Sequence, residues 1–306
     1  MSGIEDETGE ARERGLLGGI ALMLTGAVSN QTGAALGAHA FPAIGPAGVV
    51  AVRQVVAAAV LVPLARPPFR RMTRAQWWPV LLLAAVFATM NLSLYSAIER
   101  IGLGLAVTLE FLGPLGVALA GSRTRLDLVI ALAAGVGVYV LVLPGPTSDY
   151  VGLALALVAA GCWAAYIVLN RLLGARLPGL QAPAAATSVS ALVYLPVLGW
   201  LIAAGRFTPA ALAYAVCAGV LSSAVPYAVD LVALRRVPQR FFGVFMSINP
   251  VIAALAGIVL LGQVLELHEW LGIAIVVVAN VVAVSTTRPV PQPAPEEADA
   301  VVTGAG

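Results

Sequence analysis

Long apolar segments with almost no charge constrain this chain more than any other feature of its sequence. A membrane helix needs about 20 mostly apolar residues to cross a bilayer core of roughly 30 Å. Ten segments of about that length follow one another, separated by short polar or Gly- and Pro-rich breaks, at residues 15–36, 43–65, 76–98, 102–121, 126–143, 151–169, 182–204, 209–231, 240–261 and 270–286. The sequence therefore predicts an all-α integral membrane protein with ten transmembrane helices.

The composition excludes most functions of soluble proteins. Of the 306 residues, 60% are hydrophobic and 10% are charged, whereas about a quarter are charged in an ordinary soluble domain. All basic residues are arginines, and a net charge of +2 gives no signature of nucleic-acid binding. The two cysteines, Cys162 and Cys217, lie inside apolar segments and predict neither a disulfide framework nor a thiolate metal site. No metalloprotease, phosphate-loop or nucleophile-elbow motif is present, so we expect no enzyme, no metal and no cofactor.

The arginines orient the ten predicted helices, because cytoplasmic loops of membrane proteins carry an excess of positive residues. If the N-terminus is cytoplasmic, 14 arginines fall on the cytoplasmic side, and only Arg100 and Arg206 fall outside. We therefore predict that both termini are cytoplasmic. Residues 1–14 form a short N-terminal tail in this interpretation, and residues 287–306, which are rich in proline and acidic residues, form a disordered C-terminal tail.

The chain also repeats itself. Sliding the sequence by 136 residues makes seven positions in and before the fourth predicted helix coincide with positions in and before the ninth, Pro114 with Pro250 among them. The two repeats are residues 15–143 and 150–286, with five helices each. Because five is odd, the second repeat must enter the membrane with inverted topology. Inverted repeats around a site near the midplane are how many secondary transporters achieve alternating access, so we predict two inverted five-helix repeats around a central cavity.

Three polar side chains lie deep within predicted helices. At about 1.5 Å per residue, Arg53, Glu110 and Asn249 are roughly 12–15 Å from the membrane surface. A charge at that depth costs about 3 kcal/mol or more, so Arg53 and Glu110 must face the interior of the bundle. Two interpretations remain open. The pair can be a structural ion pair that locks two helices together, or Arg53 can hold a substrate carboxylate while Glu110 holds an ammonium group or a transported proton.

Three prolines are expected to kink the helices that contain them, since proline cannot donate to the carbonyl group four residues earlier. The prolines are Pro114, Pro226 and Pro250, and the carbonyl groups left free belong to Glu110, Ser222 and Met246. Such breaks are tolerated in a membrane where they are buried in protein or line a water-filled cavity.

Other polar residues are weaker candidates for the same cavity. They are Gln31, Asn91, Tyr95 and Tyr166, whose presence is explained equally well by hydrogen bonds between helices. A further group lies near the cytoplasmic end of the eighth predicted helix and consists of Asp230, Arg235 and Arg236. For this group we expect a salt bridge at the helix end, with a cytoplasmic gate as the alternative.

Several stretches of the chain resemble the EamA-type members of the drug/metabolite transporter superfamily. They are residues 41–53 (FPAIGPAGVVAVR), 91–119 (NLSLYSAIERIGLGLAVTLEFLGPLGVAL), 161–166 (GCWAAY) and 221–262 (LSSAVPYAVDLVALRRVPQRFFGVFMSINPVIAALAGIVLLG). Within that superfamily the chain is most similar to the bacterial exporters of threonine and homoserine. The resemblance covers most of the predicted helices.

The resemblance implies ten helices in two inverted repeats and export of amino acids or related metabolites across the bacterial inner membrane. The partners that it implies are a small amino-acid-like substrate, protons as the coupling ion, and the lipid bilayer. The sequence departs from the family at three positions where a glutamate is frequent, since it has Asp230, Asn249 and Gln263. Two carboxylates are thereby lost, which leaves Glu110 as the main candidate for coupling.

Arg53 and Glu110 at one depth favour a small zwitterionic substrate, because they can address a carboxylate and an amine together. The alternative within transport is efflux of hydrophobic cations, which would use Glu110 and an aromatic wall. A third possibility is a membrane scaffold that transports nothing, in which the two charges have a structural role only.

Overall fold

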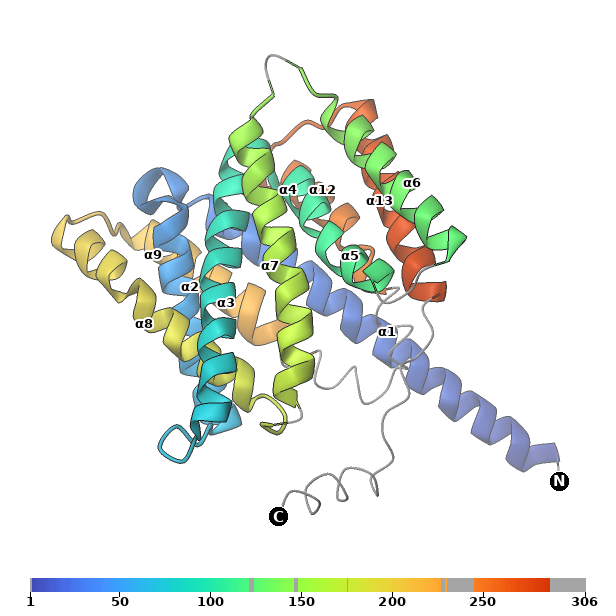
Figure 1. The fold of residues 1–306 in the computed structure, drawn as a ribbon, viewed down its shortest axis with the longest axis horizontal. Helices are drawn as coiled ribbons and strands as arrows, with labels where there is room; N and C mark the ends of the chain where they lie inside the picture. Colours follow the sequence, from blue (N-terminus) through green and yellow to red (C-terminus); the bar gives the residue numbers. More distant parts are fainter. Residues whose placement is uncertain are drawn as a thin grey trace.

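Every described element of the computed structural model is helical (Figure 1). The structure describes residues 2–120, 124–145, 148–174, 176–226, 229 and 245–286, with side chains described from residue 18 onward. The helices are α1 (Ser2–Ala38), α2 (Phe41–Ala65), α3 (Arg74–Ile101), α4 (Leu103–Glu110), α5 (Leu112–Ala120), α6 (Arg125–Val142), α7 (Tyr150–Gly174), α8 (Gln181–Ala203), α9 (Pro209–Gly219), the π-helix η1 (Val220–Ala224), α12 (Asn249–Leu261) and α13 (Leu267–Thr286). The gate residues Asp230, Arg235 and Arg236 and the C-terminal tail lie outside the described residues.

Within the part of the chain that the structure describes, seven helices are long and apolar enough to cross a membrane. They are α2, α3, α6, α7, α8, α13 and the segment Leu103–Ala120, which joins α4 and α5. Two shorter apolar helices, Pro209–Ala224 and Asn249–Leu261, fall in the eighth and ninth predicted segments, and α1 contains the first. An all-helical integral membrane protein is thus confirmed.

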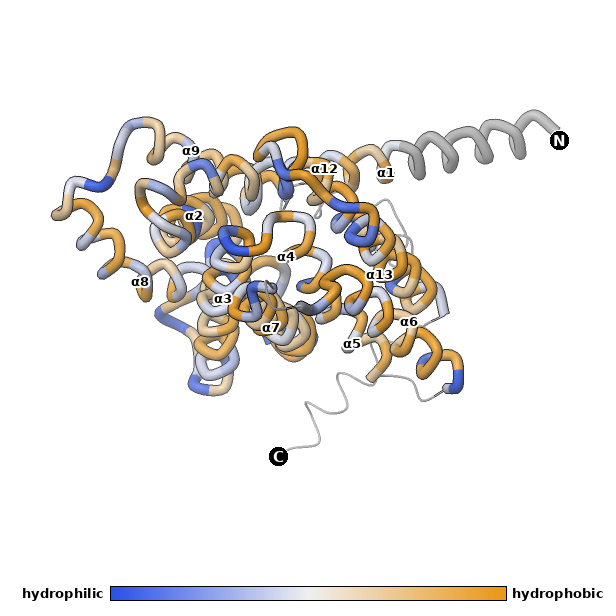
Figure 2. The backbone as a smooth tube through the Cα atoms, turned by 90° about the horizontal axis from the view of Figure 1, so that it is seen from above, coloured by the Kyte–Doolittle hydropathy of each residue, from blue (hydrophilic) through white to orange (hydrophobic). Residues whose placement is uncertain are grey.

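The outer faces of the helices are apolar. Figure 2 shows hydrophobic residues along most of each helix and hydrophilic ones mainly near the ends and in connecting loops. Large aliphatic side chains point outward, and Leu132, Leu192 and Ile202 are each more than 60% exposed, at 62%, 63% and 68%. A water-soluble monomer rarely shows contiguous apolar surface on this scale, so these faces are suited to lipid.

Helices from the two halves of the chain interleave. In the packing, α2 lies against α8, α4 against α12, and α6 against α13, while α3 packs on α7 and α1 on α9. The largest buried cluster draws side chains from both halves, among them Val49, Leu103, Ala218 and Ala253. The bundle therefore has a shared core rather than one core for each half.

Two of the helices are interrupted beside prolines. The fourth predicted segment ends its first helix at Glu110, turns at Phe111 and resumes as α5. This break falls three residues ahead of Pro114, for which the sequence predicted a kink. In the eighth segment, α9 passes into the π-helix η1 just before Pro226, a feature that the sequence analysis did not foresee. Breaks at these positions expose backbone acceptors inside the bundle.

Close packing of α6 on α13 depends on a glycine. A Cβ atom at Gly272 would lie 2.5 Å from the backbone of Leu141, whereas one at Gly135 of α6 would meet nothing within 4 Å. We expect Gly272→Ala to destabilise the protein by about 1–3 kcal/mol through overpacking. Gly135→Ala should leave stability unchanged or raise it by roughly 0.5–1 kcal/mol, because alanine favours the helix. Thermal unfolding of both variants in detergent measures the difference, and equal melting temperatures would contradict this packing.

Candidate substrate site

A polar cavity of about 230 Å³ lies where helices of both halves meet. Its walls come from α1, α2, α3, α4, α7, α8, η1 and the start of α12. The polar side chains that line it are Asn30, Gln31, Arg53, Gln54, Asn91, Glu110, Thr187, Ser222, Ser223 and Asn249. Four aromatic side chains complete the wall, and they are Phe87, Phe111, Trp163 and Tyr166.

Arg53 on α2 is held by the interrupted eighth helix. Its Nη2 donates to the carbonyl oxygen of Ser222 at 3.0 Å, and its Nε donates to Oγ of Ser223 at 3.2 Å. The Ser222 carbonyl lacks a donor four residues later because that residue is Pro226. The guanidinium carbon also lies 5.3 Å from the ring centre of Tyr95, within the range of a cation–π contact. Arg53 therefore donates to the same carbonyl group whose α-helical donor the proline removes.

Glu110 is the last residue of α4, directly before the turn at Phe111. Its side chain is 6% exposed and lines the cavity. No other described residue donates a hydrogen bond to its carboxyl group or forms an ion pair with it. The direct ion pair with Arg53, one of the two interpretations left open by the sequence, is therefore not formed in this structure. Buried polar groups almost always have a hydrogen-bond partner. A ligand in the cavity could supply the partner for this carboxyl group.

A second polar group lies between α1 and α12. Nε2 of Gln31 donates to Oδ1 of Asn249 at 3.2 Å, and Nδ2 of Asn249 donates to the carbonyl oxygen of Met246 at 2.9 Å. The Met246 carbonyl is the one that Pro250 was expected to leave without a helical donor. The side chain of Asn249, the residue before this proline, donates to it instead. Asn249 is thereby fixed in orientation, with its amide at the cavity wall.

The structure brings most of the sequence-predicted residues together. The cavity is lined by Gln31, Arg53, Asn91, Glu110, Tyr166, Pro226 and Asn249. Pro114 and Pro250 are not among the lining residues. Pro114 follows the turn at Phe111, and Pro250 is the second residue of α12.

Tyr95 does not line the cavity. It is fully buried next to it, with Phe41 edge-on to its ring at 6.0 Å. Its hydroxyl oxygen has no hydrogen-bond partner in the described part of the chain. The sequence could not distinguish this position from a lining one, because it does not show how α3 is rotated within the bundle.

Three polar lining side chains were not among the candidates expected from the sequence, namely Gln54, Thr187 and Ser223. Gln54 donates from Nε2 to Oγ of Ser190 at 2.6 Å. Each belongs to a predicted helix that carries few polar residues, and Ser223 lies one turn before Pro226. Isolated polar residues close to a buried charge or a proline were the signal that could have found them.

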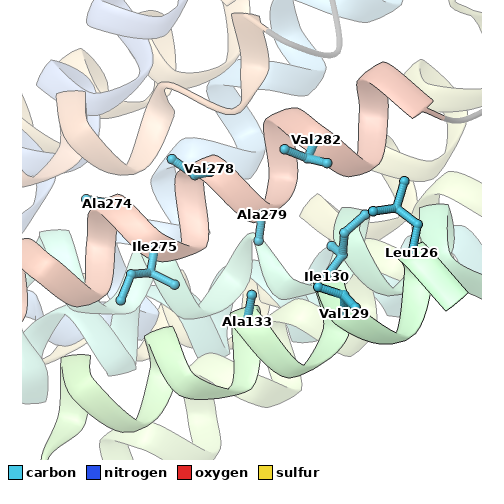
Figure 3. A pocket seen from close by; sticks show the side chains of 9 residues that line it. All are labelled: Leu126, Val129, Ile130, Ala133, Ala274, Ile275, Val278, Ala279 and Val282. Carbon is cyan, nitrogen blue, oxygen red and sulfur yellow. The ribbon is translucent and has the colours of Figure 1, made fainter.

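A larger groove elsewhere has no polar chemistry. It measures about 380 Å³ and lies between α6 and α13 (Figure 3). Its side chains are all aliphatic, and they are Leu126, Val129, Ile130, Ala133, Ala274, Ile275, Val278, Ala279 and Val282. With no donor, acceptor or charge, this groove cannot orient a polar solute, so the smaller polar cavity is the candidate site.

A bundle of apolar helices around a small polar cavity with buried charges places the protein in the class of membrane transporters for small molecules. A family model described as the EamA-like transporter family matches residues 150–285. The chain is 33% identical over 272 residues to the threonine/homoserine exporter RhtA of Escherichia coli (strain K12), covering 88% of this chain and 92% of the relative. It is also 33% identical over 276 residues to the threonine/homoserine exporter RhtA of Salmonella typhimurium (strain LT2), covering 89% and 93%. The chain belongs to the EamA-like transporter family.

The fold has a counterpart among solved structures. A crystal structure that is 18% identical in sequence superposes with a TM-score of 0.57, covering 89% of this chain and 97% of the other. At that identity the likeness concerns the fold alone.

The buried hydroxyl of Tyr95 generates a prediction about stability. An unsatisfied buried hydroxyl costs about 1–3 kcal/mol, so Tyr95→Phe should raise the melting temperature in detergent. Tyr194→Phe is the matched control, because the Tyr194 hydroxyl donates to the carbonyl oxygen of Ala88 at 2.8 Å, and we expect its loss to lower the melting temperature. A decrease of the same size in both variants would show that the Tyr95 hydroxyl is satisfied.

Proposed function

We propose that the protein is a secondary transporter that exports small amino acids of the threonine and homoserine type, or related metabolites, across the bacterial inner membrane. The observation that carries this proposal is that Glu110 lies in the same cavity as Arg53 and its carboxyl group has no hydrogen-bond or ion-pair partner among the described residues. A carboxylate and a guanidinium that face one cavity without neutralising each other offer one site for an ammonium group and one for a carboxylate. Free amino acids carry both groups.

The size of the cavity supports a small substrate. At about 230 Å³, it is smaller than the roughly 300–1,000 Å³ typical of sites for drug-sized ligands. The relatives in Escherichia coli and Salmonella typhimurium, named for threonine and homoserine, align over most of both chains. Transfer of that substrate class to this protein is consistent with the charges of the cavity.

A second candidate is efflux of hydrophobic cations. Two aromatic pairs line the cavity beside Glu110, with ring centres 4.6 Å apart for Phe111 and Trp163 and 5.4 Å apart for Phe87 and Tyr166. Aromatic faces attract cations. The cavity wall contains more aromatic side chains than the composition of the chain suggested. Arg53 argues against this candidate, because it places a positive charge in the same small space.

We further propose that ten helices form two inverted repeats, residues 15–143 and 150–286, with both termini in the cytoplasm. A two-fold relation between the halves predicts that each helix contact has a counterpart in which both helices are replaced by their equivalents. The counterpart of the α3–α7 contact is the α9–α1 contact, and the pairs α2–α8, α4–α12 and α6–α13 are their own counterparts. All of these contacts occur. Gln54 and Ser190 support the same symmetry, because they are hydrogen-bonded and are 136 positions apart, the offset of the sequence repeat. Residues that are equivalent and in contact lie at a two-fold axis.

Glu110 is also the proposed coupling group. Its carboxyl group can hold a proton or the ammonium group of the substrate, but not both at once. Exchange of one for the other during alternating access would couple export of the amino acid to entry of a proton.

Transport in proteoliposomes tests the proposed function. We expect labelled threonine to be transported by the parental protein, and Arg53→Ala to lower its flux about tenfold or more, as loss of a charge-assisted hydrogen bond predicts. Glu110→Gln should lower flux and abolish its response to a pH gradient. Glu99→Gln and Arg206→Ala change exposed charges and should leave transport unchanged.

A panel of labelled amino acids and lipophilic cations, tested in the same proteoliposomes, decides between the two candidate functions. Flux of amino acids alone supports the first candidate, and flux of lipophilic cations alone supports the second. No flux of any solute, with normal folding of the double variant Arg53→Ala/Glu110→Ala, would overturn both in favour of a scaffold.

A further inference from the structure

Only part of the hydrogen-bonding capacity of Arg53 is used. The planar guanidinium group carries five N–H donors. The bonds to Ser222 and Ser223 take the Nε–H and one N–H of Nη2, which lie on the same edge of the plane. Both N–H groups of Nη1 and the second N–H of Nη2 have no hydrogen-bond partner among the described residues. These remaining donors form the end of the guanidinium group, which matches the two oxygens of a carboxylate.

The groups that hold Arg53 are themselves held in place. Oγ of Ser222 donates to the carbonyl oxygen of Asn30 at 2.8 Å, and Oγ of Ser29 donates to the carbonyl oxygen of Leu221 at 2.8 Å. Gly33 allows this approach, because a Cβ atom there would meet the side chain and backbone of Ser222. The π-helix η1 is therefore fixed against α1 at the level of the arginine. A π-helix fixed to α1 by two hydrogen bonds orients the flexible side chain of Arg53 more firmly than a free π-helix could.

We propose that Ser223 and the carbonyl group of Ser222 freed by Pro226 are positioning groups that present the end of the Arg53 guanidinium to the substrate carboxylate. This inference rests on the proposed function and adds how the site selects its ligand. The substrate class that it specifies is a small molecule with a free carboxylate. An amino-acid amide keeps the ammonium group, but it has no negative charge and only one acceptor oxygen, so it cannot place a separate oxygen on each N–H at the end of Arg53.

Three serine substitutions test this role by their effect on the KM and the maximal rate of threonine transport. Ser223→Ala removes the acceptor for Nε, and we expect KM for threonine to rise about tenfold while the maximal rate stays within about twofold. Ser223→Thr keeps a hydroxyl group and should keep the parental KM. Ser188→Ala is the matched control, because Oγ of Ser188 donates to the carbonyl oxygen of Ala184 within α8, and Ser188 does not line the cavity.

Pro226→Ala tests the carbonyl group separately. Alanine restores an N–H that can donate to Ser222 and compete with Arg53, so KM should rise here as well. A second measurement compares how strongly threonine and threonine amide inhibit transport of labelled threonine. A purely structural role of these groups would not change the ratio of the two inhibition constants. In the parental protein threonine should inhibit far better than its amide, and in Ser223→Ala and Pro226→Ala this preference should shrink.

The outcomes of these experiments distinguish failure of the positioning role from failure of the proposed transport function. Parental protein without saturable amino-acid flux would overturn the proposed function. Parental flux with an unchanged KM in Ser223→Ala, or a lower maximal rate at an unchanged KM, would overturn the positioning role alone. The positioning role would also be overturned if Ser223→Ala raised KM by the same factor in an Arg53→Lys background. Lysine has no planar guanidinium group for Ser223 to orient, so the effect of Ser223→Ala should disappear there.

Discussion

The carbonyl group of Ser222 cannot receive the usual α-helical hydrogen bond because residue 226 is proline, and Arg53 donates a hydrogen bond to it. A buried guanidinium without partners would cost several kcal/mol, and backbone and hydroxyl oxygens offset part of that cost without removing its charge. Because these two hydrogen bonds hold the arginine, its position does not depend on an ion pair with Glu110. The cavity therefore keeps a cation and a carboxyl group that are separately available to a ligand.

This arrangement depends on close contact between the two halves of the chain. Arg53 and Glu110 both belong to the first half, whereas Ser222, Ser223 and Asn249 belong to the second. Small residues let the helices approach, as at Gly33 against η1 and at Gly104, where a Cβ atom would lie 3.0 Å from Cα of Ala254. A movement of one half against the other would change the hydrogen bonds of Arg53 and the surroundings of Glu110 together.

The sequence predicted the features that depend on depth and on proline chemistry. Charge within an apolar segment placed Arg53 and Glu110 inside the bundle, and the missing N–H of proline predicted free carbonyl groups at Ser222 and Met246. The sequence did not predict which side chain occupies each carbonyl, because that depends on the rotation and packing of helices far apart in the chain. The same limit explains Tyr95, which is deep enough to reach the cavity but is rotated into the core. It also explains the π-helix η1, which no local pattern separates from an α-helix.

The most direct test of the account is a structure of the protein determined with threonine bound. The account predicts that the amino acid lies in the polar cavity, with its carboxylate on Nη1 and Nη2 of Arg53 and its ammonium group on Glu110, while the bonds from Arg53 to Ser222 and Ser223 persist. Threonine bound elsewhere, or a direct ion pair between Arg53 and Glu110 that excludes it, would contradict the account.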